Sequence, residues 1–293
     1  MSNPKVSFEF FPPADEPATR DLLACVDRLA PLGPHFVSVT CGADGSTRTR
    51  TNACVGRIRG GTALTVAPHL TCVGASRTEV LELAKDYWRA GVRHLVALRG
   101  DAPESDASAG RRCRPHPDGF AYASDLVDGL ARVGDFDISV AAYPEGHPES
   151  AGIAADLANL QRKVDAGATR AITQFFFDTD LFLSYRDRCA AMGIRVRLVP
   201  GILPITRLPQ LLRFAARCGA SVPAWLRRRF DGLDEDPETR RMIAAHVAMD
   251  QVQRLREEGI EEFHFYTLNR AELTYAICHA LGLRPPVAEA AVA

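Results

Sequence analysis

Seven glycines divide the chain, and each comes shortly before a run of apolar, strand-like residues. The glycines are Gly33, Gly61, Gly91, Gly134, Gly167, Gly193 and Gly259, and the runs that follow them cover residues 36–40, 64–69, 94–98, 137–143, 170–174, 196–200 and 262–267. Most of these glycines close an amphipathic helix, a position that favours glycine because it adopts the left-handed conformation without a Cβ penalty. With the opening run at residues 5–11, the pattern predicts eight strands that alternate with helices.

Eight such repeats in 293 residues indicate an α/β fold, a (β/α)8 TIM barrel, rather than an open doubly wound sheet. A dinucleotide-binding sheet would need a GxGxxG turn after its first strand, and the sequence has none. We expect a single domain, with the barrel at about residues 5–285 and a frayed tail at 286–293. An extra helical segment at 223–230 should lie between strands seven and eight, before Asp236-Pro237 opens a long helix. The loop 102–119, rich in Ser, Pro, Gly and Arg, is expected to be a flap or a surface insertion.

Composition narrows the class of protein and its partners. The chain is 46% hydrophobic and 24% charged, with a formal net charge of -1, so it has no field that would attract nucleic acid or an anionic membrane. It has no membrane-length apolar stretch and no signal-peptide pattern. The eight cysteines include no CxxC pair, and Cys113-x-x-His116 lacks the second pair of ligands that zinc needs. We expect a cytoplasmic protein with reduced thiols and no metal.

The opening strand carries one carboxylate, Glu9, between phenylalanines, and ends at Pro12-Pro13 because proline cannot continue a strand ladder. Burial there disfavours the charged carboxylate, which suits a proton donor working near pH 7. A structural glutamate held by an arginine explains the same stretch equally well.

Polar residues recur where the predicted strands end, and in a (β/α)8 barrel the active site gathers at those ends. They are Glu9, Thr40, His69, Arg99-Gly100-Asp101, Tyr143 with Glu145 and His147, Gln174, and Tyr266 with Asn269 and Arg270. Singly, each has an ordinary alternative: His69 a satisfied core histidine, Asp101 a cap or a partner of Arg99, Gln174 a rim hydrogen bonder. Together they predict a site, and without a metal cluster or a Ser-His-Asp order it suits a flat organic cofactor.

The helix after strand five places Asp156, Asn159 and Lys163 on one face. Spacing alone favours a solvated stripe for these three residues.

Nine phrases in order resemble the short bacterial type of methylenetetrahydrofolate reductase, over about residues 5–285. They are Ser7-Phe8-Glu9-Phe10-Phe11-Pro12-Pro13, Ser38-Val39-Thr40, Pro68-His69-Leu70-Thr71-Cys72, Ala97-Leu98-Arg99-Gly100-Asp101, Ala141-Ala142-Tyr143-Pro144-Glu145, Lys163-Val164-Asp165-Ala166-Gly167-Ala168, Ile172-Thr173-Gln174-Phe175-Phe176-Phe177, Pro200-Gly201-Ile202-Leu203-Pro204 and Phe263-His264-Phe265-Tyr266-Thr267-Leu268-Asn269-Arg270. Nine phrases at strand ends make a specific resemblance.

The resemblance implies a flavoenzyme of one-carbon metabolism and methionine biosynthesis. In that family NADH or NADPH reduces FAD, and the flavin then reduces 5,10-methylenetetrahydrofolate to 5-methyltetrahydrofolate in a ping-pong cycle. Family members are homo-oligomers, often tetramers. The sequence itself shows no motif that separates NADH from NADPH.

By motif match, the resemblance also implies roles for individual residues. Glu9 would protonate folate N10 and open the five-membered ring, and Asp101 would stabilise the resulting cation. Gln174, Phe214 and Arg270 would join them in binding the substrates. FAD would be held by Thr40, His69, Arg99, Gly100, Asp101, Tyr122, Ala123, Tyr143, His147, Asp156, Asn159 and Lys163, which replaces the solvated-stripe interpretation of the helix after strand five.

Two departures and two alternatives accompany the resemblance. Cys41 stands where the family often has an aromatic residue, and the segment 111–117 matches no family motif. A regulatory domain that responds to S-adenosylmethionine is not expected. Proline dehydrogenase, another FAD barrel, would not explain the Glu9 strand or the Leu98-Arg99-Gly100-Asp101 phrase. A non-catalytic folate- or flavin-binding barrel would not need a buried acid.

Overall fold

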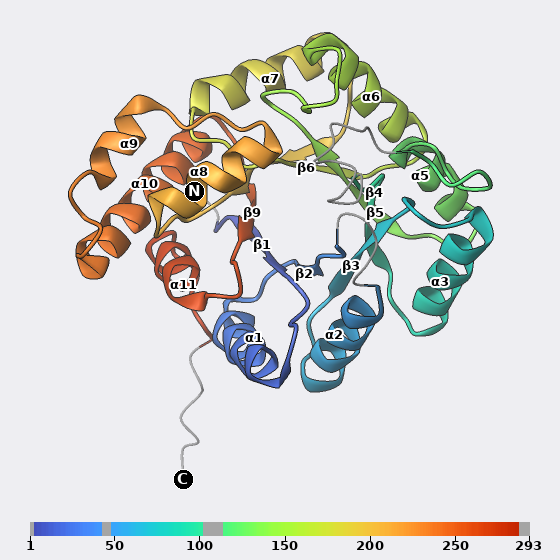
Figure 1. Ribbon diagram of the computed structural model, residues 1–293, viewed down its shortest axis with the longest axis horizontal. Coiled ribbons are helices and arrows are strands. Elements are labelled where there is room, and N and C mark those ends of the chain that lie inside the picture. Colours follow the sequence, from blue (N-terminus) through green and yellow to red (C-terminus); the bar gives the residue numbers. More distant parts are fainter. Residues whose placement is uncertain (1–2, 43–47, 102–113, 287–293) are drawn as a thin grey trace.

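The computed structural model describes residues 3–42, 48–101 and 114–286. Within them, nine parallel strands form one sheet in the order β7-β6-β5-β4-β3-β2-β1-β9-β8, and helices surround it (Figure 1). The strands are β1 (Lys5–Phe10), β2 (Phe36–Val39), β3 (Val66–Thr71), β4 (His94–Leu98), β5 (Asp137–Ala142), β6 (Arg170–Thr173), β7 (Arg197–Val199), β8 (Gly201–Ile202) and β9 (Glu262–Tyr266). The predicted (β/α)8 barrel is confirmed.

The seventh predicted strand is broken into two, which is why nine strands appear in place of eight. Pro200 has no N–H to donate and separates β7, which pairs with β6, from β8, which pairs with β9. The break is held on both sides, because Gly201 N donates to Thr173 Oγ1 at 2.9 Å and His264 N donates to the Pro200 carbonyl at 3.0 Å. The split strand completes the ring between β6 and β9.

The helices lie outside the strands. They are α1 (Glu16–Leu29), the 3-10 turn η1 (Ala30–Leu32), α2 (Arg48–Gly61), α3 (Arg77–Arg89), α5 (Ala123–Ala131), α6 (Ile153–Asp165), α7 (Thr179–Ala191), α8 (Leu208–Cys218), α9 (Ala224–Phe230), α10 (Pro237–Glu257) and α11 (Ala271–Ala280). The extra segment expected before the long helix is confirmed as α9. Of the loop expected at 102–119, residues 102–113 lie outside the described residues.

Five of the seven glycines have the left-handed conformation expected of a glycine that ends a helix. Gly33, Gly91, Gly167, Gly193 and Gly259 all have positive φ, whereas Gly61 and Gly134 do not. Gly134 is constrained by space instead, because a Cβ there would lie 2.6 Å from the Trp88 ring.

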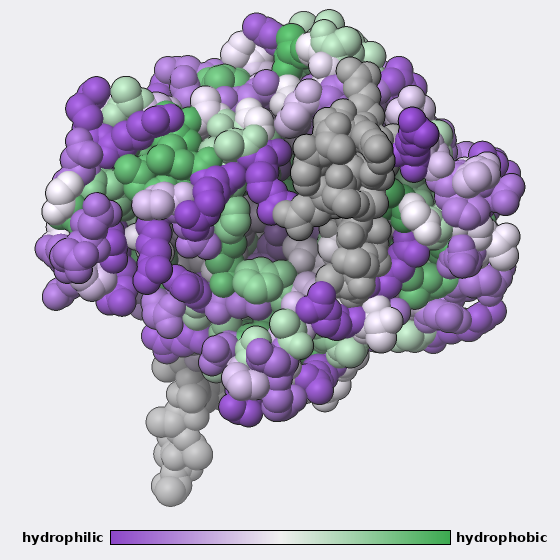
Figure 2. All heavy atoms as spheres, viewed as in Figure 1, coloured by the Kyte–Doolittle hydropathy of each residue, from purple (hydrophilic) through white to green (hydrophobic). Residues whose placement is uncertain are grey.

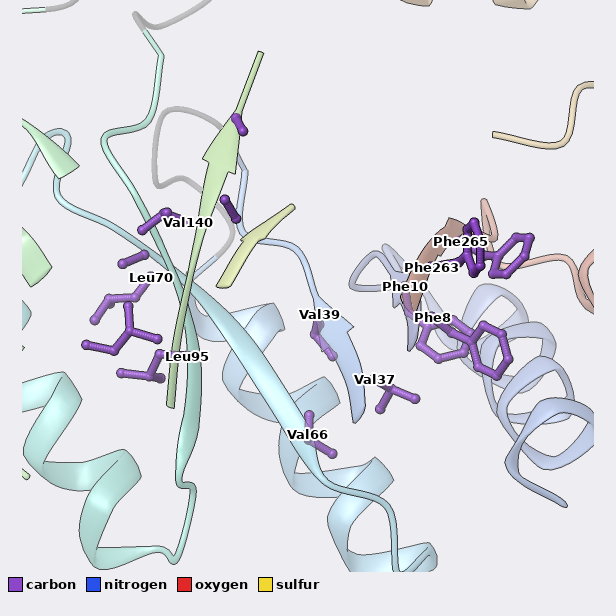
Figure 3. Close-up of a cluster of buried hydrophobic side chains, with 14 of the residues drawn as sticks. Phe8, Phe10, Val37, Val39, Val66, Leu70, Leu95, Val140, Phe263 and Phe265 are labelled. Atoms are coloured by element: carbon purple, nitrogen blue, oxygen red, sulfur yellow. The ribbon is translucent and has the colours of Figure 1, made fainter. Parts of the chain in front are cut away.

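Strand alternation decides which β1 residues face the barrel interior. Phe8 and Phe10 are buried beside Phe263 and Phe265 of β9, and Figure 3 shows the four rings gathered together. Successive side chains of a strand point to opposite faces, so Glu9 points into the barrel.

A network of buried charges occupies the amino-terminal end of the barrel. Arg170 is 1% exposed; its Nε donates to Glu262 Oε1 at 2.8 Å and its Nη1 to Asp137 Oδ2 at 3.1 Å. His94 joins them, with Nε2 2.8 Å from Ser139 Oγ and 3.4 Å from Arg170 Nη1. We call Arg170, Glu262, Asp137 and His94 the Arg170 network.

A second apolar cluster lies at the opposite end, under α8, α9 and α10. Phe175 and Phe177 after β6 pack with Leu211 of α8, Leu226 of α9 and Val247 of α10. This satellite core fixes three helices against the carboxyl ends of the strands. No helix within the described residues is both long enough and apolar enough to cross a membrane.

Candidate active site

A cavity of about 550 Å³ opens at the carboxyl ends of β2 to β5, with α5 and α6 on its outer side. Figure 2 shows hydrophilic residues beside a hydrophobic patch on the face that Figure 1 presents, where α8 crosses in front of the barrel. All twelve residues predicted to hold FAD line this one cavity: Thr40, His69, Arg99, Gly100, Asp101, Tyr122, Ala123, Tyr143, His147, Asp156, Asn159 and Lys163. The fold therefore brings these twelve residues together, and FAD as their ligand is a prediction. Cys41, the departure from the family pattern, lines the same cavity.

Helix α6 presents its polar face to the cavity and not to open solvent. Asp156 is buried, and its Oδ2 accepts from His147 N at 2.7 Å, while Lys163 Nζ donates to the Ala141 carbonyl at 2.8 Å. The solvated-stripe interpretation from spacing alone is therefore wrong, because Lys163 joins α6 to β5 and Asp156 joins α6 to the loop after β5. Burial lowers the pKa of Lys163 to about 8, although Asp156 opposes that shift.

Arg99 does not pair closely with Asp101. Its Nη1 lies 2.8 Å from Glu149 Oε2, whereas its Nη2 lies 4.0 Å from Asp101 Oδ1, and the Asp101 side chain is 63% exposed. Asp101 is therefore free to face a ligand, whereas Arg99 is held in place. Sequence reasoning missed Glu149, which follows His147 by two residues in the loop after β5 and lines the same cavity.

Glu9 lies inside the barrel between two histidines. Its Oε2 is 3.4 Å from His69 Nε2 and 3.5 Å from His264 Nε2. Both separations exceed an ordinary N–H···O hydrogen bond, and each Nε2 is buried without a hydrogen-bond partner in the described structure. Burial lowers the pKa of His69, although Glu9 opposes that shift. We call Glu9, His69 and His264 the Glu9 cluster.

The arginine partner considered for Glu9 is not found. The ion pairs of Glu9 within the described residues are with His69 and His264 alone. His264 was not singled out as a site residue, although its place two residues before Tyr266 puts it on the inward face of the same strand. Its Nδ1 lies 2.7 Å from Ser7 Oγ, which fixes the orientation of the ring.

The other predicted substrate residues are more dispersed. Arg270 lines a second cavity of about 640 Å³ at the end of β9. Gln174 lies in a small crevice with Tyr143 and Cys218, and Phe214 is half-buried against the satellite core. The structure brings neither of these two into the lining of the two larger cavities.

The loop that carries Arg270 is held in a strained conformation. Leu268 and Asn269 have φ values of 51° and 55°, which non-glycine residues seldom adopt. Asn269 holds the turn by accepting from Phe11 N at 3.1 Å and donating to the Phe11 carbonyl at 3.0 Å. Such strain persists only where surrounding contacts enforce it, and it is frequent near functional sites.

Known proteins share both the sequence and the fold. The family model described as methylenetetrahydrofolate reductase matches residues 1–282. The chain is 56% identical to 5,10-methylenetetrahydrofolate reductase of Pectobacterium carotovorum over 97% of its own length and 92% of that protein. It is 53% identical to the Escherichia coli protein of the same name, over 96% of its own length and 91% of that protein.

A solved structure from Clostridium thermocellum covers 96% of this chain, and this chain covers 94% of it, with a TM-score of 0.62 and 13% identity. At 13% identity this likeness shows a shared fold alone.

The family model and the two bacterial relatives show that this chain belongs to the methylenetetrahydrofolate reductase family.

Proposed function

We propose that this protein reduces 5,10-methylenetetrahydrofolate to 5-methyltetrahydrofolate, with NADH or NADPH as the hydride donor and FAD as the resident cofactor. The observation that carries the proposal is the Glu9 cluster: a carboxyl group inside the barrel, between two imidazole nitrogens that have no hydrogen-bond partner among the described residues. Buried polar groups are nearly always paired in native structures, so these unpaired nitrogens are available to a substrate; His69 itself lines the cavity at the ends of β2 to β5.

The donor set of the cavity at the ends of β2 to β5 fits a phosphate-bearing cofactor such as FAD. Arg99 and Lys163 supply positive charge, and Tyr143 supplies an aromatic face. Thr71 Oγ1, on the same lining, is buried without a hydrogen-bond partner in the described structure. FAD bound there would accept hydride from the nicotinamide and give it to the folate. Asp156, Asn159 and His147 would hold the cofactor from α6 and the loop after β5.

Glu9 is proposed as the acid that protonates N10 of the folate, which opens the five-membered ring and leaves a 5-iminium cation. The Ser7–His264 contact lets Glu9 exist in either protonation state. When His264 Nδ1–H donates to Ser7 Oγ, the Nε2 lone pair faces Glu9, with 3.5 Å between Nε2 and Glu9 Oε2. When Ser7 donates to Nδ1, Nε2–H faces the carboxylate, so the same pair also holds Glu9 after proton transfer.

Asp101 is proposed to stabilise the cation that forms on the folate, because its exposed carboxylate at the cavity wall is not tied closely to Arg99. Gln174, Phe214 and Arg270 are proposed to bind the substrates, as the family resemblance implies. The Clostridium thermocellum neighbour is described as binding two copies of 5-methyl-5,6,7,8-tetrahydrofolic acid, which agrees with a folate ligand on this fold.

A non-catalytic folate-binding barrel is the second candidate, because the neighbour's description names binding alone. The two are separated by anaerobic stopped-flow spectroscopy of the purified, FAD-supplemented protein. We expect NADH or NADPH to bleach the flavin absorbance and 5,10-methylenetetrahydrofolate to restore it, and the faster nicotinamide identifies the donor. A protein that stays colourless with added FAD, or that is not reoxidised by the folate, would exclude the reductase.

A further inference from the structure

The loop after β5 lies between helix α8 and the cavity at the ends of β2 to β5. We call residues 145–149 the β5 loop. His147 N donates to Asp156 Oδ2 at 2.7 Å, and Glu149 Oε2 lies 2.8 Å from Arg99 Nη1, so one side of the loop is fastened to the cavity lining. Its other side meets the end of α8.

The carboxyl end of α8 packs closely against the β5 loop. Gly219, which follows α8, has a φ of 71°, and a Cβ there would lie 3.0 Å from Pro148 Cγ. Glycine suits this position because it accepts a positive φ and leaves room for the neighbouring chain. Ser221 N then donates to Glu145 Oε2 at 2.9 Å. Glu145 thus holds the end of α8, the helix that carries Phe214.

Glu145 uses one of its two carboxylate oxygens in this contact. Its Oε1 is buried and has no hydrogen-bond partner within the described residues. A buried acceptor without a donor is costly and uncommon in native structures. We therefore expect a donor to face this second oxygen.

Gln174 offers a donor in the same crevice. It follows β6 and, with Glu145, lines a crevice of about 10 Å³ between the β5 loop and the end of α8. A space of that size is at the lower limit for one water, so no substrate enters it and its lining groups face one another. The side-chain amide of Gln174 forms no hydrogen bond with the described residues. Of the other polar side chains there, Cys218 is a weak donor and Tyr143 also lines the proposed FAD cavity.

We propose that Glu145 is a positioning residue that orients the Gln174 amide. Glu145 Oε1 accepts from the Gln174 NH2 group, and the Gln174 carbonyl then faces the substrate. A carbonyl in that place accepts from the N–H groups along the edge of a reduced pterin ring and disfavours a ring edge that has acceptors alone. The inference rests on the proposed function, since it takes Gln174 to contact the folate.

The test is calorimetric binding of 5-methyltetrahydrofolate to the purified, FAD-loaded protein. Glu145→Gln keeps an oxygen for Ser221 N but presents an NH2 group to Gln174, which turns the Gln174 amide over and points its own NH2 at the substrate. Affinity for the folate should fall about tenfold, because one hydrogen bond is lost and two donors are brought together.

A second substitution should repair the first. Glu145→Gln/Gln174→Glu again places a carboxylate opposite an amide, with the net charge of wild type, so affinity for the folate should return to within about threefold of wild type. Glu261→Gln is the matched control, because it removes the same charge from an exposed side chain before β9, and it should bind the folate as wild type does.

Each outcome has a separate meaning. Equal affinity of Glu145→Gln and wild type overturns the proposal, because Glu145 then acts through Ser221 N alone. A double variant that binds no better than Glu145→Gln overturns it as well, because a change at Gln174 repairs an inverted amide but not a displaced helix. If wild type itself binds no folate, the proposed function fails and this inference fails with it.

Gln174→Glu alone covers the case in which Glu145→Gln does not fold. Two carboxylates would then face each other across the crevice, so affinity for the folate relative to wild type should be lower at pH 8 than at pH 5.5, where one of them takes up a proton. A ratio of affinities that does not change with pH would overturn the contact between Glu145 and Gln174.

Discussion

The Arg170 network and the Glu9 cluster are made of the same kinds of residue, yet they are organised in opposite ways. In the Arg170 network the buried guanidinium donates to two carboxylates at 2.8 and 3.1 Å. In the Glu9 cluster the carboxylate lies 3.4 and 3.5 Å from two histidine nitrogens that have no hydrogen-bond partner in the described structure. The polar groups of the Arg170 network are paired with one another, whereas those of the Glu9 cluster are available to a ligand.

This difference matches the proposed division between structural charge at one end of the barrel and functional charge at the other. Conservation at the amino-terminal face of such barrels serves stability, whereas the carboxyl-terminal face carries chemistry. Substitutions in the Arg170 network should therefore act first on folding, and substitutions in the Glu9 cluster or in the cavity that His69 lines should act first on turnover.

The largest effect on stability is expected for Arg170→Met, which leaves Glu262 and Asp137 without their buried partner. Breaking a buried ion pair from one side costs about 3–5 kcal/mol. Denaturant unfolding followed by circular dichroism measures the loss. Arg197→Met is the matched control, because Arg197 pairs with the same Glu262 at 3.5 Å but is half exposed, and it should cost less than about 1 kcal/mol. Equal losses in the two variants would show that burial does not distinguish these pairs.

A smaller effect is expected from the titration of His94. Burial lowers its pKa to about 3, although Asp137 opposes that shift. Between pH 6.5 and about 3 the unfolded chain therefore binds a proton that the folded protein does not, so stability falls as pH falls, by up to about 1.4 kcal/mol per pH unit from this group. The unfolding free energy of His94→Gln, measured from pH 6.5 to 4.5, should fall less steeply than that of wild type. Parallel curves would contradict a neutral His94 in the folded state.

At the opposite end of the barrel, Asp101→Asn should slow reduction of the folate about tenfold, since it removes charge beside a developing cation. Reduction of the flavin by the nicotinamide should change less, because that step forms no cation on the folate. Stopped-flow traces of the two half-reactions measure both. Asp135→Asn, an exposed carboxylate before β5, is the control, and an equal effect from it would show that Asp101 acts only through net charge.

The smallest effect is expected on FAD affinity, from the titration of Lys163. Burial lowers the pKa of Lys163 to about 8; Asp156 opposes this shift, and Arg99 and Arg162 add to it. Its ammonium loses charge as pH rises through that value, so FAD phosphates should bind less tightly at pH 9 than at pH 7. Binding at pH 8.5 should draw a proton onto the protein. Calorimetry in buffers of different ionisation enthalpy detects that uptake, which Lys163→Met should abolish. Release of a proton by wild type would contradict the assignment.

Much of the barrel could be predicted from the sequence because its signals are local. Glycine stops and apolar runs repeat along the chain, and each depends on neighbours a few residues away. The break at Pro200 was not predicted, since it depends on which flanking strand each half pairs with. Spacing alone wrongly predicted a solvated polar face on α6. The reason is that Asp156 and Lys163 form hydrogen bonds with backbone groups in β5 and in the loop after it.

The residues predicted to hold a cofactor lie together in one cavity, whereas their contacts with one another were not predicted. The predicted cofactor residues come together because parallel strands end at one face. The partners of Glu9 could not be predicted in the same way, since His264 is 255 residues distant and its contact depends on barrel closure between β1 and β9.

The role of Glu9 is tested most directly by measuring both half-reactions in Glu9→Gln by anaerobic stopped flow. Loss of a general acid slows the step it serves by about 10²–10⁴-fold, so oxidation of the reduced flavin by 5,10-methylenetetrahydrofolate should fall by that factor. Reduction by the nicotinamide should stay within about threefold of wild type, since it requires no such acid. Equal slowing of both half-reactions, or an undiminished rate with the folate, would contradict the assignment of Glu9 as the proton donor.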